Sequence, residues 1–206
     1  FVWMGEILFR TKLSENLFEG LSPWMQKLPG GLIHVNVVGC AIFAAISGSS
    51  AATVATVGKM SIPELRKRNY PEKILLGSLA GSGTLGLLIP PSIILIIYGV
   101  TVQESIAKLF IAGIFPGIMI AIIFMTYVVI WSLMNKNKMP VLTEEIPFIE
   151  KIKKSGKLIP VILLIVSVIG SIYSGLATAT EAASLGVVGA LILSFFQKSL
   201  TIDSFK

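Results

Sequence analysis

The sequence has almost none of the side chains on which metal and redox chemistry usually depend. Cys40 is its only cysteine and His34 its only histidine. An intrachain disulfide and a zinc site built from Cys and His ligands are therefore excluded. Charged residues make up only 14% of the 206 residues, whereas 54% are hydrophobic and the mean hydropathy is +0.85. Soluble domains of ordinary composition are less apolar, so we predict an integral membrane protein.

Acidic residues are also scarce, with 11 Asp and Glu against 17 Lys and Arg, which gives a net charge of +6. Most of the basic residues lie in two short connectors between apolar segments: Lys59, Arg66, Lys67, Arg68 and Lys73, then Lys136, Lys138, Lys151, Lys153, Lys154 and Lys157. This clustering argues against a nucleic acid partner, and by the positive-inside rule it predicts that both connectors are cytoplasmic.

The chain begins Phe-Val-Trp-Met-Gly, without an initiator methionine or a basic region before an apolar core. We therefore expect no signal peptide here and interpret the chain as a fragment of a longer protein.

Roughly 20 apolar residues are needed for each helical crossing of a bilayer, and this requirement divides the chain into membrane segments and connectors. We predict an all-α protein of spanning helices, with one re-entrant helical hairpin and one broken helix. The segments are 1–28 (the end of a membrane helix and an interfacial amphipathic helix), 29–58 (re-entrant hairpin), 59–73 (basic cytoplasmic connector), 74–100 (broken transmembrane helix), 108–134 (transmembrane helix), 135–157 (cytoplasmic loop) and 158–198 (two transmembrane helices).

The apolar stretch from Gly30 to Gly58 is interrupted at its middle by Ser47-Gly48-Ser49-Ser50. An interruption at membrane depth is tolerated only beside protein or a water-filled cavity, because lipid cannot satisfy the freed backbone groups. Transporters use such breaks to hold ions and substrates. The competing interpretation is a patch of small residues where helices pack closely.

A second interruption follows within 74–100, where Gly83-Thr84-Leu85-Gly86 precedes Pro90-Pro91-Ser92. Proline removes a backbone donor, which weakens a continuous helix and frees carbonyl groups. A binding site formed by both interruptions is one interpretation, and a single kinked helix relieved by local packing is the other.

Three further patterns favour structural interpretations. Thr178 and Glu181 have the spacing of a capping box, which we prefer to a role for Glu181 in binding a coupling ion. The glycine-rich run 77–83 lacks the Lys-Ser or Lys-Thr of a phosphate loop. A serine nucleophile at 47–50 would need His34 nearby, and we expect His34 in the core or at headgroup level instead.

Taken together, the motifs resemble the large membrane subunit of tripartite ATP-independent periplasmic (TRAP) transporters, over nearly the whole chain. The resemblance rests on Leu28-Pro-Gly-Gly-Leu followed by Val35-Asn-Val, Ala45-Ile-Ser-Gly-Ser-Ser-Ala-Ala-Thr, Gly83-Thr-Leu-Gly, Ile89-Pro-Pro-Ser, Tyr98-Gly and Gly175-Leu-Ala-Thr-Ala-Thr-Glu-Ala-Ala.

This resemblance implies a multi-pass protein of the bacterial inner membrane that is not an enzyme and needs no cofactor. It implies sodium-coupled import of a small organic acid, of the C4-dicarboxylate or sialic acid class, by an elevator-type transporter with inverted repeats. A periplasmic binding protein would deliver the acid, and a small membrane subunit would be the second partner. The substrate-binding residues implied are Ser47, Gly48, Ser49 and Ser50. The sodium-binding residues implied are Ser47, Ser49, Gly83, Thr84, Pro90, Pro91 and Ser92.

Other functions stay open at this point. A dicarboxylate or citrate symporter of similar architecture would need no binding protein. An intramembrane enzyme would use one of the serines at 47–50 as its nucleophile, and a scaffold subunit would have no site of its own.

Overall fold

The computed structural model describes residues 1–11, 13–140 and 147–196, and every regular element in these ranges is a helix. The all-α prediction is therefore confirmed for the described part of the chain. Parts of the predicted segments 1–28, 135–157 and 158–198 lie outside it. Three helical stretches are long and apolar enough to cross a membrane, namely Ile106–Met134, Phe148–Tyr173 and Ala179–Phe196.

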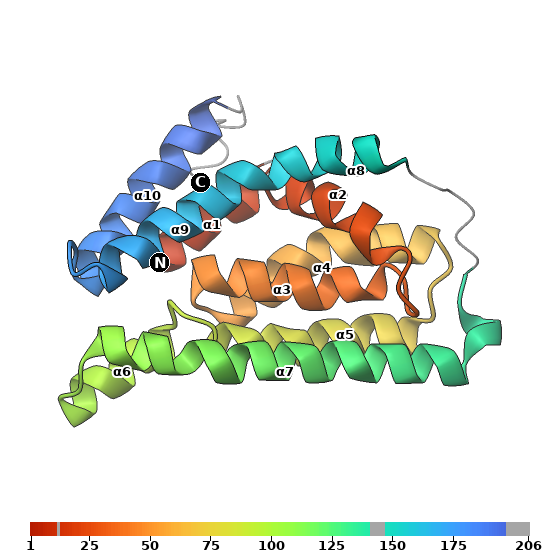
Figure 1. Ribbon diagram of the computed structural model, residues 1–206, viewed down its shortest axis with the longest axis horizontal. Coiled ribbons are helices and arrows are strands. Elements are labelled where there is room, and N and C mark those ends of the chain that lie inside the picture. Colours follow the sequence, from red (N-terminus) through yellow and green to blue (C-terminus); the bar gives the residue numbers. More distant parts are fainter. Residues whose placement is uncertain (12, 141–146, 197–206) are drawn as a thin grey trace.

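The helices of the first half surround the two interruptions (Figure 1). They are α1 (Val2–Arg10), α2 (Leu13–Met25), α3 (Ile33–Ser47), α4 (Ser50–Lys67), α5 (Glu72–Gly83), the 3-10 turn η1 (Thr84–Leu87) and α6 (Ile93–Val102). The second half consists of α7 (Ile106–Met134), η2 (Lys136–Lys138), α8 (Phe148–Ser155), η3 (Gly156–Leu158), α9 (Ile159–Tyr173) and α10 (Ala179–Phe196).

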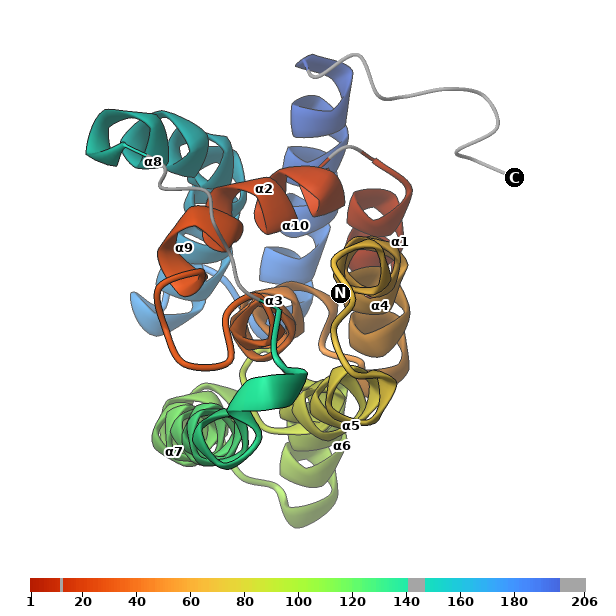
Figure 2. The same ribbon diagram turned by 90° about the vertical axis from the view of Figure 1, so that its right-hand side faces the viewer.

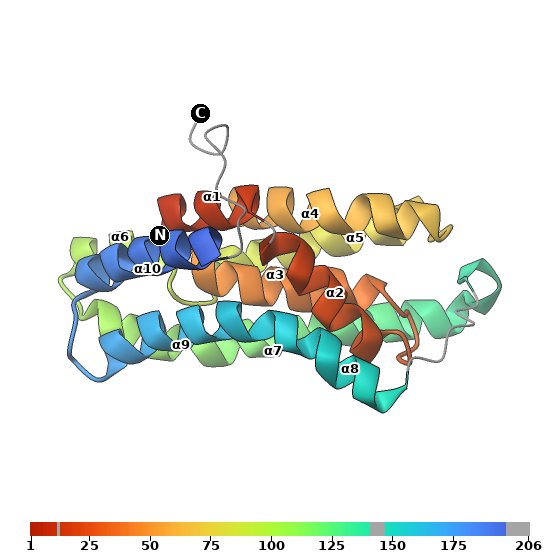
Figure 3. The same cartoon turned by 90° about the horizontal axis from the view of Figure 1, so that it is seen from above.

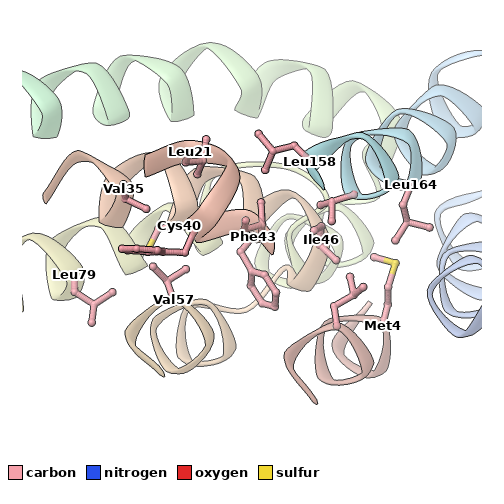
Figure 4. Close-up of a cluster of buried hydrophobic side chains, with 14 of the residues drawn as sticks. Met4, Leu21, Val35, Cys40, Phe43, Ile46, Val57, Leu79, Leu158 and Leu164 are labelled. Carbon is pink, nitrogen blue, oxygen red and sulfur yellow. The ribbon is translucent and has the colours of Figure 1, made fainter. Parts of the chain in front are cut away.

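Helix α3 lies at the centre of the molecule, with α1, α2, α4, α5 and α7 packed around it (Figure 2). Its sequence is apolar on nearly every side, and a helix of that kind is stable only when it is buried. Phe43, Ile46 and Cys40 of α3 are at most 1% exposed. They meet side chains from α1, α2, α4, α5 and α9, among them Met4 and Val57 (Figure 4). The central position of α3 fixes where its C-terminal end lies.

The start of α10 shows the predicted capping box. The backbone N–H and the hydroxyl of Thr178 both donate to Glu181 Oε2 at 2.8 Å, and the Glu181 N–H donates back to Thr178 Oγ1 at 3.4 Å. The carboxylate of Glu181 is therefore engaged in capping the helix. Glu6, the other acidic residue in an apolar stretch, forms an ion pair with Arg10 at 2.6 Å.

Both basic connectors lie at one end of the bundle, and the turns after α6 and α9 lie at the other (Figure 1). Tyr70, in the connector between α4 and α5, reaches back to the beginning of α3. Its hydroxyl accepts a hydrogen bond from the Leu32 N–H at 3.0 Å, and its side chain is only 4% exposed. Because the first N–H groups of a helix have no partner within it, Tyr70 satisfies one that would otherwise be buried alone.

Replacing Tyr70 by phenylalanine tests this anchor. Tyr70→Phe leaves the buried Leu32 N–H without an acceptor, which should cost about 1–3 kcal/mol of stability. We expect a lower apparent melting temperature for the full-length protein in detergent. Tyr127→Phe is the matched control, because the Tyr127 side chain is 58% exposed and its loss should change little. Equal melting temperatures for the two variants would show that the Tyr70 hydroxyl anchors nothing.

Candidate functional site

The first interruption is a tight turn between α3 and α4, called here the tip (residues 47–50). Helix α3 ends because Gly48 adopts the left-handed conformation, with φ +60°, and its N–H donates to the Ala44 carbonyl at 3.1 Å. Glycine adopts this conformation without steric cost. Ser49 then begins α4 as its N-cap, because its hydroxyl accepts from the Ala52 N–H at 3.5 Å.

The hydroxyls of the tip form a local network. Ser47 is fully buried, and its Oγ lies 2.9 Å from Thr53 Oγ1 and accepts from the Ser49 N–H at 3.3 Å. Thr53 Oγ1 in turn donates to the Ser49 carbonyl at 2.8 Å. The turn is therefore held by side chains as well as by backbone, which makes the tip a defined structure and not only a break in a helix.

The second interruption, called here the break (residues 88–92), separates η1 from α6. Its middle is Pro90-Pro91, joined by a cis peptide bond; neither residue has a backbone N–H to donate. The Ser92 hydroxyl donates to the Leu87 carbonyl at 2.7 Å and so links the end of the break to the end of η1. Ser92 is also the N-cap residue of α6, in an extended conformation.

The structure brings the tip and the break into direct contact. The Ile93 N–H, at the start of α6, donates to the Gly48 carbonyl at 3.3 Å. A Cβ atom added at Gly48 would lie 2.7 Å from the Pro91 carbonyl oxygen, and one added at Gly86 would lie 2.8 Å from Ser50 N. No side chain fits at either position without displacing backbone. Two interruptions 40 residues apart in sequence thus form one site.

The predicted site residues do not all face this contact in the same way. Gly83 packs against Val54 of α4 so closely that no Cβ atom fits. Thr84 is exposed, and its hydroxyl donates to the carbonyl of Gly81, near the end of α5, at 2.7 Å. The hydroxyl oxygen of Ser50 is buried and has no hydrogen-bond partner among the described residues. Ser50 is therefore the tip hydroxyl with unused hydrogen-bonding capacity.

The polar groups of this site are mainly oxygen atoms that can coordinate a cation. A hydroxyl that donates its proton to a protein carbonyl, as that of Ser92 does, still has free lone pairs on its oxygen. The carbonyl groups of the tip and the break supply further oxygen atoms. Hard cations prefer oxygen ligands. Among the described residues, no three His, Cys, Asp or Glu side chains lie together in a way that could hold a metal ion. The first N–H groups of α4 lie beside these oxygens, and a helix N-terminus favours an anion.

Sequence reasoning missed three residues of the site and its support. Thr53 completes the tip network, Gly86 permits the contact with Ser50, and Asn36 ties α3 to α5. The Asn36 side-chain amide donates to the Leu75 carbonyl at 3.2 Å and to Ser78 Oγ at 3.0 Å, while Asn36 Oδ1 is buried without a partner among the residues that the structure describes. Asn36 could have been found from the sequence, because a polar side chain within an apolar helix indicates a buried polar contact.

The serine nucleophile considered above lacks its base in the described structure. His34 stands at the opposite end of α3 from Ser47, 13 residues away, which is about 20 Å along a helix. Its Nε2 is 2.8 Å from the Pro29 carbonyl oxygen. His34 is therefore a buried structural residue at the base of α3, as expected.

Gly48 offers a direct test of the contact. Gly48→Ala places a side chain in a left-handed conformation, which costs about 1–2 kcal/mol, and forces its Cβ against the Pro91 carbonyl. We expect a clear loss of thermal stability in the full-length protein. Gly170→Ala in α9 is the control, since a Cβ there meets nothing within 4 Å and alanine is the better helix former. Equal stability of Gly48→Ala and the wild type would contradict the observed tip.

Comparison with known proteins identifies the family of this chain. The profile of one family, the tripartite ATP-independent periplasmic transporter, DctM component, matches residues 1–206. The C4-dicarboxylate TRAP transporter large permease protein DctM of Pseudomonas aeruginosa is 35% identical over 95% of this chain and 45% of its own length.

Two further relatives match the chain along nearly its whole length. The isethionate TRAP transporter permease protein DctMQ of Oleidesulfovibrio alaskensis is 35% identical over 100% of this chain and 32% of its own length. The sialic acid TRAP transporter permease protein SiaT of Haemophilus influenzae is 34% identical over 99% of this chain and 33% of its own length. The chain thus spans about a third to a half of the length of these relatives. It belongs to the DctM family, whose members are multi-pass permeases of the bacterial inner membrane and not enzymes.

Proposed function

We propose that this chain is part of a sodium-coupled importer of a small organic acid, in which the tip and the break form one half of the transport site. The observation that carries the proposal is the contact between Gly48 and the break, because it brings the oxygens of both interruptions and the helix ends beside them together inside an apolar bundle. In the full protein, α3 and α4 would act as a re-entrant hairpin and α5 with α6 as a broken helix. The other half of the site would come from an inverted repeat of an elevator-type transporter.

Sodium would be held where the tip carbonyls and hydroxyls meet the break. The proposed ligands lie on both interruptions: Ser47, Ser49, Gly83, Thr84, Pro90, Pro91 and Ser92. Oxygen dipoles without a nearby carboxylate suit a monovalent cation, because they replace its hydration shell without adding a fixed negative charge. The buried Ser47 and Ser92 are the best placed of these side chains, whereas Thr84 is exposed.

The substrate would bind at the tip through Ser47, Gly48, Ser49 and Ser50. The relatives are named for C4-dicarboxylate, isethionate and sialic acid, all of which carry a carboxylate or sulfonate group. The N-terminus of α4 and the unpartnered Ser50 hydroxyl are suited to such an anionic oxygen. Bound sodium would strengthen this interaction through its positive charge.

The proposed partners follow from the relatives. A tripartite periplasmic system supports a periplasmic binding protein that delivers the acid, and the name DctMQ supports a small membrane subunit beside the large one. The exposed apolar surfaces of α7, α9 and α10 would face the lipid bilayer or these subunits.

Uptake into proteoliposomes tests the proposal as a whole. The vesicles would hold the full-length large subunit with its small partner, and labelled dicarboxylates, isethionate and sialic acid would be supplied with and without sodium and binding protein. We expect uptake only when both are present. Uptake that proceeds without sodium would overturn the coupling, and uptake without a binding protein would identify a simple symporter.

Ser50 provides a sharper test of the tip. Ser50→Ala removes the unpartnered hydroxyl, and a hydrogen bond to a charged group is worth about 1.5–3 kcal/mol. We expect the KM for the acid, or the sodium concentration for half-maximal uptake, to rise about tenfold or more. Ser61→Ala is the matched control, because Ser61, about 16 Å farther along α4, also has a buried hydroxyl with no partner in the described part of the chain.

Normal expression with unchanged kinetics in Ser50→Ala would argue against the tip as a binding site. An equal loss in both serine variants would point to a general effect of removing buried hydroxyls from α4.

A further inference from the structure

Helix α8 carries a strongly apolar face that is largely exposed in the described part of the structure. Phe148 is 64% exposed, Ile149 82% and Ile152 54%. A water-soluble surface rarely gathers such side chains in a single short helix. The adjoining side of α8 packs on α2, and Phe148, at the edge of the apolar face, meets Trp24 of α2 edge to face at 6.2 Å between ring centroids.

The apolar face of α8 continues directly into the lipid-facing side of α9. The two helices follow each other directly, with a bend at η3 (Figures 1 and 3). Exposed side chains recur along α8 and α9 at spacings of three, four and seven residues, with Ile162 and Leu163 adjacent: Phe148, Ile152, Ile159, Ile162, Leu163 and Val166. At 3.6 residues per turn these positions form one stripe, so the apolar face of α8 is the extension of a membrane-facing surface.

Helix lengths place the edge of the membrane within α8. The 15 residues of α9 span about 22 Å, whereas the hydrocarbon core is about 30 Å thick. The missing distance of about 8 Å corresponds to about five residues, which places the headgroup region near Lys153. The amphipathic α8 therefore lies where phospholipid headgroups begin.

Basic and aromatic groups flank the stripe at this level. Lys151 lies over the Trp24 ring at 5.9 Å from its centroid, and the Trp24 indole N–H donates to Ser155 Oγ at 2.6 Å. Lys154 is neutralised by Glu150 at 3.0 Å. Lys153 is exposed and has no ion-pair partner within the described ranges. Tryptophan and lysine in this arrangement are typical of the membrane interface.

We propose that α8 and Trp24 form a binding surface for the headgroups of anionic phospholipids. Lys151 and Lys153 would contact the phosphodiester and any further negative charge, while Phe148, Ile149 and Ile152 would insert among the adjoining acyl chains. Positive charge beside an exposed apolar face selects an anionic lipid surface over a zwitterionic one. The surface is separate from the tip and the break, and it does not depend on sodium or on the imported acid.

Trp24 is a natural reporter for this surface. The full-length large subunit and its small partner would be placed in nanodiscs, with brominated phosphatidylglycerol or brominated phosphatidylcholine at equal mole fraction. The difference in fluorescence between the wild type and Trp24→Phe isolates the Trp24 signal. We expect at least twofold stronger quenching of that signal by the anionic lipid. The Lys151→Gln/Lys153→Gln variant should reduce it to the level of the zwitterionic lipid.

A variant with the same loss of charge elsewhere, Lys136→Gln/Lys138→Gln in η2, is the matched control and should retain the difference between the lipids. Equal quenching by both lipids in the wild type would overturn the proposal, because the face would then meet lipid without headgroup preference. Absence of quenching by either lipid would also overturn it, since another protein segment would then cover α8.

Discussion

Backbone polar groups that lie among apolar helices must find partners within the protein, and this constraint shapes the site. Each interruption frees N–H and C=O groups that lipid cannot satisfy. The tip and the break solve the problem together, because the Ile93 N–H bonds to the Gly48 carbonyl. The contact requires glycine at 48 and 86, since any side chain there would separate the two backbones. The packing of the surrounding helices keeps the tip and the break in contact.

The same constraint determines the chemistry that the site can perform. Hydroxyls and carbonyls are the groups a chain can leave partly unpaired at membrane depth at tolerable cost, whereas an unpaired buried charge costs far more. The acidic residues of the apolar stretches are accordingly engaged elsewhere, Glu181 in a capping box and Glu6 with Arg10. A site made of neutral oxygens can bind a cation reversibly, as a transporter must.

Local features of the sequence predicted much of this fold. The serines and glycine at 47–50, the double proline at 90–91 and the spacing of Thr178 and Glu181 each act within a few residues, so their consequences can be read without tertiary information. The contact between Gly48 and Pro91 could not be predicted in this way. Helix α3 is apolar on nearly all sides, so its sequence has no apolar stripe that would show which helix packs against which side. Thr53 and Gly86 have their roles only because of contacts between helices. The spacing of residues along the sequence does not reveal those contacts.

The most direct test of the central claim is a high-resolution structure of the full-length large subunit with its small partner in lipid, determined in sodium and again with sodium replaced by choline. We expect the tip to touch the break in sodium, and we expect density for a cation that appears among their oxygens and disappears in choline. A tip separated from the break, or a coupling cation bound at a site remote from residues 47–50 and 88–92, would contradict it.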